Sequence, residues 1–232
     1  MRDQLVAATE RVIASDGRLF ERDGVVFSTP IVPFELLTFL LRAAGRSGGT
    51  LKVLDFGGSL GSTYRQCRPF LDHLRQLRWN VVEQPAMVEI GKARFADDQL
   101  RFFDRIGDAT EGSAPDVVIF SGVLQYLDDP YHVLAEACAC GASTIIVDRN
   151  PVCALAQDVL AVQVVSSDIF PARLPFRIFG AGMIENAMGS AYRKVAEFGC
   201  VDSDAVLKAL DVRFRGQAFE RRAAEGGSHH VV

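Results

Sequence analysis

The chain has 232 residues, of which 49% are apolar and 23% charged, so it can bury one sizeable core together with an appendage. Its formal net charge of -4 leaves no basic field for a phosphate backbone, so no nucleic acid partner is expected. The five cysteines are odd in number and include no Cys-x-x-Cys pair, which favours structural thiols in a reducing cytoplasm and no metal site. The N-terminus lacks the apolar core of a signal peptide, and no apolar stretch reaches the roughly 18 residues that span a bilayer. We therefore expect a cytoplasmic protein without a membrane span.

The N-terminal part, residues 1–50, reads as a helical cap. Apolar residues at helical spacing predict a helix over 3–15, which ends at the turn Asp16-Gly17. A second helix is predicted over 34–44, and its many apolar residues favour an amphipathic helix buried on the core. A glycine-rich joint, GRSGGT, then precedes the first core strand.

From residue 51 onward, short β-rich runs alternate with helical ones, which is the pattern of βαβ units around a parallel sheet. The predicted strands are 51–56, 79–84, 100–106, 114–122 and 143–149. The predicted helices are 61–77, 87–96 and 131–140. Asp129-Pro130 supplies an N-cap and a first-turn proline for the last of these helices.

The pattern weakens after Pro151. Prolines and glycines break every period over residues 153–190, which predicts an irregular insertion or lid on the substrate side. The chain then predicts a strand over 192–198, a short helix over 202–210 and a last strand over 212–221. We expect one ligand-binding α/β domain over 51–222, followed by a frayed tail, 223–232.

The strand-to-helix turn DFGGSLGS carries the first functional signal. Gly57, Gly58 and Gly61 allow positive φ and close approach of a ligand, and the N-terminus of the following helix favours an anion. Asp55, at the end of the strand, would repel a pyrophosphate, and the turn cannot be laid onto G-x-G-x-x-G. A ligand with both a carboxylate and a cation satisfies both features, and S-adenosylmethionine (SAM) has them. The turn therefore predicts a site for the methionine end of SAM.

Glu83, at the end of the second predicted core strand, is the second signal. A carboxylate at this place can accept hydrogen bonds from both ribose hydroxyls of an adenosine ligand without a 2′-phosphate. NAD would use the same acid, so Glu83 does not distinguish the two ligands. A solvated carboxylate at a strand end is the alternative interpretation.

With these residues and the segment DVVIFSGVLQYL, the chain resembles the class I SAM-dependent methyltransferases. More narrowly, it resembles an uncharacterised bacterial group of methyltransferases with a DFGGSLGS loop, over about residues 15–220. The stretches that carry this narrower resemblance are FERDGVVF (20–27), VLDFGGSLGS (53–62), RWNVVEQPAMVEIGK (78–92) and VDRNP (147–151). The resemblance implies a Rossmann-like α/β fold whose seven-stranded, mostly parallel sheet has helices on both faces and an antiparallel last strand.

The resemblance also implies which residues surround SAM. It implies that the glycine turn surrounds the methionine and ribose parts of SAM and that Glu83 binds the ribose hydroxyls. Asp104 matches loosely the position that meets the adenine amino group, and the end of the fourth strand would line the donor. The full set of cofactor-binding candidates is Asp55, Gly57, Gly58, Ser59, Gly61, Glu83, Gln84, Asp104, Ser121, Gly122 and Val123. The general pattern is D/E-x-G-x-G-x-G, and Ser59 replaces its middle glycine, which we expect to alter the loop shape without abolishing binding.

Methyl transfer from a sulfonium needs alignment more than covalent catalysis, but an oxygen nucleophile gains from a general base. Asp148 is the candidate base, Arg149 would place an anionic or hydroxyl-rich substrate, and Tyr126 follows the fourth strand. The alternative is an Asp148–Arg149 ion pair and a core tyrosine with a wet tip. The charged run Glu21-Arg22-Asp23 predicts either a gate over the site or a solvated turn.

The predicted function is a SAM-dependent methyltransferase with an unidentified small-molecule or glycan acceptor. The resemblance suggests a loose link with surface-polysaccharide assembly. The alternative is a non-catalytic SAM- or adenosine-binding module that acts as a regulator or partner subunit. Asp55 and the missing G-x-G-x-x-G disfavour a nicotinamide oxidoreductase. The sequence indicates neither the acceptor atom nor the oligomeric state.

Overall fold

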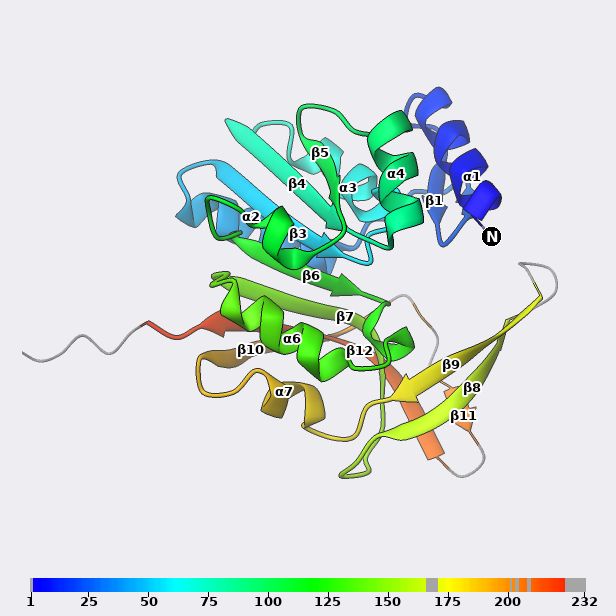
Figure 1. The fold of residues 1–232 in the computed structure, drawn as a ribbon, viewed down its shortest axis with the longest axis vertical. Helices are drawn as coiled ribbons and strands as arrows, with labels where there is room; N and C mark the ends of the chain where they lie inside the picture. The colour runs from blue at the N-terminus through cyan, green and yellow to red at the C-terminus, as the bar shows by residue number, and fades with distance from the viewer. Residues whose placement is uncertain (1, 166–170, 201, 203–204, 208–209, 224–232) are drawn as a thin grey trace, which may run out of the picture.

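The structure, a computed structural model, describes residues 2–165, 171–200, 202, 205–207 and 210–223 (Figure 1). The strands are β1 (Phe20–Arg22), β2 (Val25–Phe27), β3 (Thr50–Phe56), β4 (Gln76–Val82), β5 (Leu100–Phe103), β6 (Val117–Ser121), β7 (Thr144–Val152), β8 (Val159–Val165), β9 (Ala172–Ile178), β10 (Tyr192–Gly199), β11 (Ala205–Leu207) and β12 (Leu210–Arg221). The helices are α1 (Arg2–Ala14), α2 (Phe34–Arg46), α3 (Ser62–Cys67), α4 (Pro85–Arg94), α5 (Ile106–Ala109), α6 (Pro130–Ala139) and α7 (Met183–Ala187), with the 3-10 turns η1 (Arg68–Phe70) and η2 (Leu124–Tyr126).

The central sheet has the strand order β10-β12-β7-β6-β3-β4-β5, and β11 pairs with β12 outside this path. Strands β3 to β7 run parallel, whereas β12 runs antiparallel to both β7 and β10. The predicted seven-stranded sheet with an antiparallel last strand is therefore confirmed. The strand order reverses between β3 and β6, and the carboxyl ends of such strands border the crevice in which open α/β sheets bind ligands.

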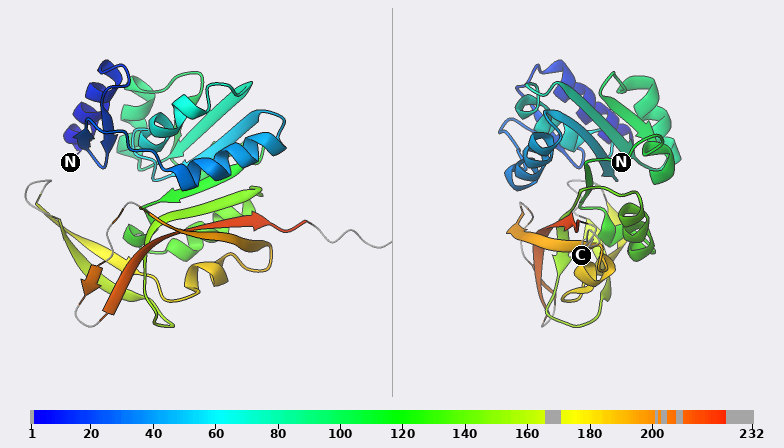
Figure 2. Two further views of the ribbon diagram at one scale, coloured as in Figure 1. Left: turned by 180° about the vertical axis from the view of Figure 1, so that it is seen from behind. Right: turned by 90° about the vertical axis from the view of Figure 1, so that its left-hand side faces the viewer.

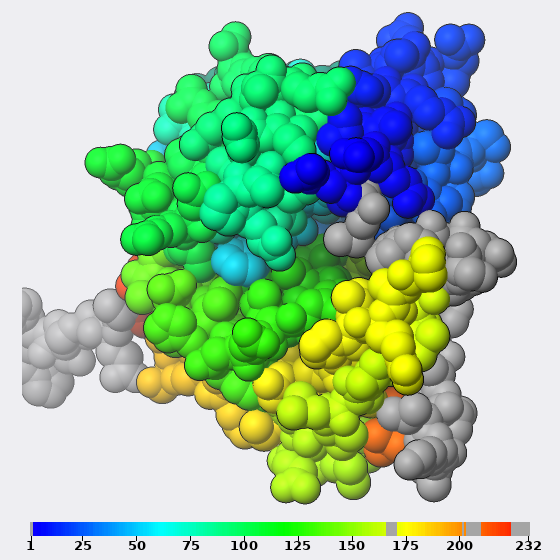
Figure 3. All heavy atoms as spheres, turned by 45° about the vertical axis from the view of Figure 1, so that its right-hand side comes forward, coloured from blue at the N-terminus to red at the C-terminus, as the bar shows by residue number. Residues whose placement is uncertain are grey.

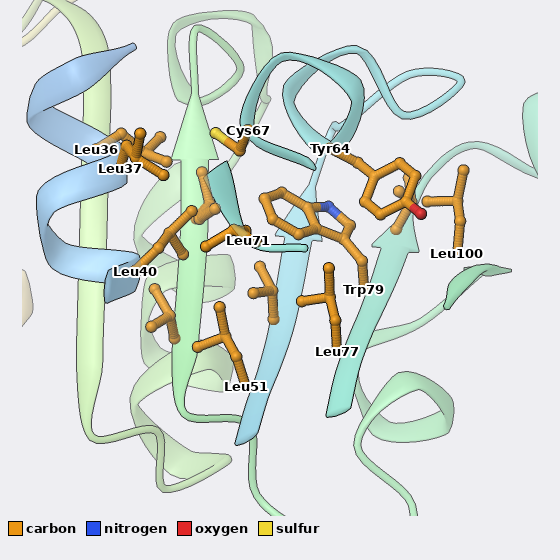
Figure 4. Packing of buried hydrophobic residues seen from close by; sticks show 14 of the residues in the cluster. Leu36, Leu37, Leu40, Leu51, Tyr64, Cys67, Leu71, Leu77, Trp79 and Leu100 are labelled. Carbon is orange, nitrogen blue, oxygen red and sulfur yellow. The ribbon is translucent and has the colours of Figure 1, made fainter. Parts of the chain in front are cut away.

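Both faces of the parallel strands are buried, because apolar side chains point alternately to the two sides. Helices α2, α3 and α4 cover one face, and α5, α6 and α7 cover the other (Figure 2). On the first face, Leu36, Leu37 and Leu40 of α2 pack toward the sheet beside Trp79, which is fully buried (Figure 4). The predicted amphipathic helix buried on the core is confirmed.

The predicted helix over 61–77 is wrong. Helix α3 ends at Cys67, the turn η1 follows, and β4 begins at Gln76. Pro69 lacks an N–H and cannot continue an α-helix beyond its first turn, so the chain tightens into the 3-10 turn instead.

The N-terminal part is not purely helical, because β1 and β2 form a hairpin between α1 and α2. Asp23 (φ 54°) and Gly24 (φ 80°) form its tip, and an Asp-Gly pair at positive φ is favoured in two-residue hairpin turns. We call residues 20–27 the N-terminal hairpin. The Asp-Gly dipeptide directly before the apolar run VVF was a usable signal for it.

The prediction that residues 153–190 are irregular is also wrong in part. It contains an antiparallel hairpin, β8–β9, and the helix α7. Pro175 did not exclude a strand there, because β9 is an edge strand of a two-stranded sheet, where a missing N–H is tolerated. We call β8–β9 the arm.

The predicted short helix over 202–210 is wrong where the structure describes it. Ala205 to Leu207 form β11, because their backbone pairs with β12 from Val212 to Leu210. Residues 203–204 and 208–209 lie outside the described residues, as does nearly all of the predicted tail. All five cysteines are free. Within the described chain, no helix is long and apolar enough to cross a bilayer.

Candidate functional site

A pocket opens at the carboxyl ends of β3, β6 and β7, where the strand order reverses. We call it the strand-end pocket. The sequence-predicted residues that line it are Asp55, Gly57, Gly58, Ser59, Ser121, Asp148 and Arg149. Tertiary structure therefore brings three separate predicted motifs to one place.

The glycine loop, residues 57–61, is packed too tightly for a Cβ at each of its three glycines. A Cβ on Gly57 (φ 74°) would lie 2.4 Å from Val123 Cγ2, and one on Gly58 would lie 2.5 Å from Asp55 Oδ2. Gly61 (φ 89°) caps α3, and a Cβ there would lie 2.9 Å from Leu100. The loop backbone therefore forms the pocket wall itself, so a ligand can approach its peptide groups closely.

Ser59 stands where the general pattern has a glycine, and its φ of 53° is in the left-handed region. The Ser59 N–H donates to Glu83 Oε1 at 3.2 Å, which ties the loop to the end of β4. Its Oγ is buried and has no hydrogen-bond partner among the described residues. The loop that lines the strand-end pocket thus holds an unsatisfied hydroxyl.

The Glu83 carboxylate also accepts the Gln84 N–H at 2.8 Å, and burial raises the pKa of Glu83. Glu83 does not line the strand-end pocket directly; it is joined to it through Ser59. The interpretation of Glu83 as a freely solvated carboxylate does not hold, because both of its oxygens accept backbone hydrogen bonds.

Asp55 is almost completely buried at the end of β3. Its Oδ2 accepts a hydrogen bond from Trp79 Nε1 at 3.0 Å. Burial raises the pKa of Asp55 to about 7, although the bond from Trp79 opposes this shift. A cation in the pocket would favour the charged carboxylate.

Asp148 lies opposite Ser121 in the register of β7 and β6. The Ser121 hydroxyl donates to Asp148 Oδ2 at 3.3 Å, and the backbone N–H of Gly122 donates to the Asp148 carbonyl at 2.9 Å. Burial raises the pKa of Asp148 to about 6, and the Arg149 charge opposes the shift. A carboxylate with this pKa is mostly ionised at neutral pH and can still accept a proton.

Arg149 bridges two distant parts of the chain. Its Nε donates to Asp202 Oδ2 at 2.7 Å, and its Nη2 donates to Asp23 Oδ2 at 2.8 Å. Burial lowers the pKa of Arg149, but the two carboxylates outweigh this effect and the pKa rises. Arg149 is thus paired with Asp23 and Asp202, and we call these three residues the ion bridge.

The N-terminal hairpin is fixed at its other end by Glu21. This carboxylate is buried, and it accepts hydrogen bonds from the Ser62 hydroxyl and from the Gly24 N–H. Gln66 Nε2 donates to the Glu21 carbonyl at 2.8 Å. The hairpin therefore spans from α3 to Arg149 beside the pocket, and Glu21 is not part of a solvated turn.

The other predicted site residues do not line the pocket. Gln84 is the exposed N-cap of α4, and Asp104 is exposed directly after β5. Val123 packs against Gly57. Tyr126 is part of η2, and its hydroxyl bonds to Gln163 Oε1 of the arm at 2.8 Å while its ring packs against Phe176. The structure does not bring Tyr126 to Asp148.

Arg22 and Asp23, from the predicted charged run, also line the pocket. Three further lining residues carried no site signal in the sequence: Glu35 from the start of α2, Phe198 from the end of β10, and Cys200 directly after it. Among the described residues, no three histidine, cysteine or acidic side chains gather as metal ligands.

Comparison with known proteins finds no matching protein-family model and no matching curated protein. Solved structures do match. A SAM-dependent methyltransferase from Clostridium acetobutylicum superposes with a TM-score of 0.54 and 10% identity, over 95% of this chain and 99% of that one. The N-terminal domain of EvdMO1, solved with S-adenosylhomocysteine (SAH) and D-fucose present, gives 0.52 and 13%, over 92% and 95%.

Magnesium protoporphyrin IX methyltransferase from Synechocystis PCC 6803, with bound SAH, also matches, with a TM-score of 0.52 and 13% identity over 82% and 81% of the two chains. The likeness lies in the fold, since the identities are low. The strand order and the antiparallel last strand make this a Rossmann-like fold of the class I methyltransferase type.

Proposed function

We propose that this chain is a SAM-dependent methyltransferase that acts on a small-molecule or glycan acceptor. The observation that carries the proposal is the buried Asp55 carboxylate against a loop whose three glycines leave no room for a Cβ. A carboxylate at this place disfavours the pyrophosphate of a dinucleotide and favours a ligand with a positive charge. The neighbours of known structure that were solved with SAH support the same ligand.

The residues present fit the chemistry of SAM. Asp55 would face the cationic end of SAM, and SAM would come close to the loop backbone around Gly58. Ser59 Oγ, which has no partner among the described residues, would form a hydrogen bond with it. Glu83, with Gln84 beside it, would accept the ribose hydroxyls. The remaining candidates for holding the donor are Asp104, Gly61, Ser121, Gly122 and Val123.

When bound, SAM would supply an electrophilic methyl group on a sulfonium; an acceptor oxygen would attack the methyl carbon in line with the C–S bond, and SAH would be the leaving group. Asp148 would take the proton from the acceptor hydroxyl onto its carboxylate as the new C–O bond forms and the C–S bond breaks. Ser121 holds one oxygen of this carboxylate, and burial keeps the pKa of Asp148 near 6, close enough to neutrality for a general base.

The ion bridge would act as a gate for the pocket. Arg149 lines the pocket and joins Asp23, at the tip of the N-terminal hairpin, to Asp202. The hairpin base is held by buried contacts of Glu21, whereas the Asp23 side chain is 68% exposed, so the tip is the weaker attachment. Donor and product would pass when this tip detaches. In this arrangement Arg149 would organise the gate, and it would contact an acceptor only when released.

For the acceptor, we infer a hydroxyl-bearing small molecule or sugar. The Asp148–Ser121 pair supports an oxygen nucleophile, and the EvdMO1 domain was solved in the presence of D-fucose. Tyr126 and the arm would form the wall on the acceptor side. A role in surface-polysaccharide assembly, in the cytoplasm, is the biological setting that the resemblance suggests.

Calorimetric titration with SAH and with NAD in parallel tests the donor. We expect SAH to bind and NAD not to bind; binding of NAD alone would refute the proposal. Turnover is tested separately with methyl-labelled SAM and fractionated cell extract. If SAH binds but no fraction ever becomes labelled, the non-catalytic SAM-binding module is the better description.

A further inference from the structure

A second cavity lies beside the N-terminal hairpin. It is a groove of about 660 Å³ between α1, β1 and the continuous segment formed by α3 and η1. We call it the N-terminal groove. Helix α1, which forms one of its walls, lies at the outside of the molecule, in dark blue in Figures 1 and 3. A volume of this size is within the range of the cavities that bind small molecules.

Strand β1 separates the N-terminal groove from the strand-end pocket. Phe20 and Glu21 of β1 line the groove, whereas the next residue, Arg22, lines the pocket. The Ser62 hydroxyl donates to the Glu21 carboxylate, and Gln66 Nε2 donates to the Glu21 carbonyl, so β1 is bonded to α3 between the two cavities. The groove is therefore a second site and not an extension of the first.

The walls of the groove are mostly apolar. Ile13 of α1 and Phe70 of η1 line it and keep exposed fractions of 53% and 39%. The other apolar lining residues include Val12, Leu19, Phe20 and Val32. Exposed apolar side chains gathered in a hollow favour a ligand with an apolar part.

Two arginines add positive charge to this apolar groove. Arg65 and Arg68 are three residues apart in continuous helical backbone, so their side chains share a face. Arg65 donates to the Leu60 carbonyl and Arg68 Nε to Gln99 Oε1, and neither arginine forms an ion pair with a carboxylate of the described residues. Burial lowers the pKa of Arg65, and the nearby Glu21 charge opposes the shift without cancelling it. Because buried cations are normally paired, Arg65 lacks an anion.

The acidic residues of the groove do not supply this anion. The Glu21 carboxylate already accepts hydrogen bonds from the Ser62 hydroxyl and the Gly24 N–H, and burial raises its pKa. Asp16 is exposed at the end of α1 and forms no ion pair within the part of the chain that the structure describes. The charge and the apolar walls therefore call for one ligand that is both anionic and apolar.

We propose that the N-terminal groove binds a small amphiphilic carboxylic acid, whose carboxylate pairs with Arg65 and Arg68 and whose apolar part lies against Ile13 and Phe70. This inference does not rest on the proposed function. A guanidinium binds a carboxylate through two parallel hydrogen bonds, and the terminal nitrogens of Arg68 have no hydrogen-bond partner among the described residues. A purely apolar ligand would leave both cations unpaired, and a small inorganic anion would leave the apolar walls exposed.

Calorimetric titration with dodecanoate, below its micelle concentration, tests the proposal. One dodecanoate should bind per chain. It should bind at least about tenfold more tightly than butyrate, which has the same head group without the long chain. It should also bind at least about tenfold more tightly than dodecylammonium, which has the same chain with the opposite charge.

Two pairs of variants place the ligand in the groove. Arg68→Gln should weaken dodecanoate binding about tenfold or more, whereas Arg22→Gln, the matched arginine of the strand-end pocket, should keep the wild-type affinity. Ile13→Asp, which sets a carboxylate on the apolar wall, should weaken binding to a similar degree. Leu41→Asp is its control, because Leu41 is an exposed residue of α2 outside the groove.

Unchanged melting temperatures would show that all four variants are folded, and Ile13 and Leu41 are exposed enough to be replaced without loss of the core. The proposal is overturned if dodecanoate does not bind, or if butyrate or dodecylammonium binds as tightly. It is also overturned if Ile13→Asp keeps the wild-type affinity, or if Arg22→Gln weakens binding and Arg68→Gln does not.

Discussion

Replacing Ser59 separates the strain of the glycine loop from its ligand chemistry. Ser59 holds φ 53°, and a left-handed backbone costs a non-glycine residue about 1–2 kcal/mol. Its buried Oγ has no partner among the described residues, and such a hydroxyl costs about 1–3 kcal/mol. Ser59→Gly relieves both costs, but the unfolded chain gains about 0.5–1 kcal/mol of backbone freedom. Ser59→Ala relieves only the second cost.

Both variants should therefore be more stable than the wild type without ligand, by about 1 kcal/mol or more. For a chain of this size, that corresponds to a Tm higher by about 2–4 °C in a calorimetric scan. Both should also bind SAH more weakly, by about three- to tenfold in a titration, because the hydroxyl no longer bonds to the ligand. Stability and affinity would then change in opposite directions.

Gly57→Ala is the matched control from the same loop, with the opposite expectation for stability. Its Cβ would lie 2.4 Å from Val123, so it should lower the Tm. The reasoning about Ser59 is refuted if Ser59→Gly lowers the Tm. It is equally refuted if both Ser59 variants keep the wild-type affinity for SAH, since the hydroxyl then serves no ligand.

Glu83→Ala should weaken SAH binding about tenfold or more, or about 1.4 kcal/mol, and unchanged affinity in the same titration would remove Glu83 from the site. Because burial raises the pKa of Asp55 to about 7, its carboxyl is increasingly protonated below that pH. SAH affinity should therefore fall below pH 7 by up to about tenfold per pH unit, and Asp55→Asn should abolish this pH dependence. An affinity that is flat across this range in the wild type would contradict that assignment. Asp148→Asn should lower the methyl-transfer rate by about 10²-fold or more and remove its rise through pH about 6, with SAH affinity retained; a retained pH profile argues against Asp148 as base. Asp23→Asn should speed SAH release and make it less sensitive to salt in stopped-flow measurements, and an unaltered salt dependence would leave the gate without support.

The sequence by itself determined the parallel core and the glycine loop. Strands β3 and β6 follow from short apolar runs with both faces buried, a property that each segment shows locally. The glycine loop could be predicted because positive φ and close backbone packing restrict the residue type at Gly57 and Gly61. Asp55 stood out because a carboxylate is unusual in a turn built for anions. That the sheet is mostly parallel with an antiparallel last strand was implied by the resemblance, and the strand pairing confirms it.

Only the tertiary structure decided which charges meet. Arg149 is 126 residues from Asp23 and 53 residues from Asp202, so no spacing along the chain could reveal the ion bridge. The strand β11 was likewise decided by the tertiary structure, because it pairs with the part of β12, Leu210 to Val212, that pairs with neither β7 nor β10. The early end of α3, by contrast, has a local signal in Pro69. In the arm, VLAVQVV is apolar at both alternating sets of positions apart from Gln163, so its pattern could not tell the half-buried face from the exposed one. Which face of β8 is covered depends on which one contacts Phe176 and Tyr126, because burial depends on the neighbours that the fold brings to a side chain.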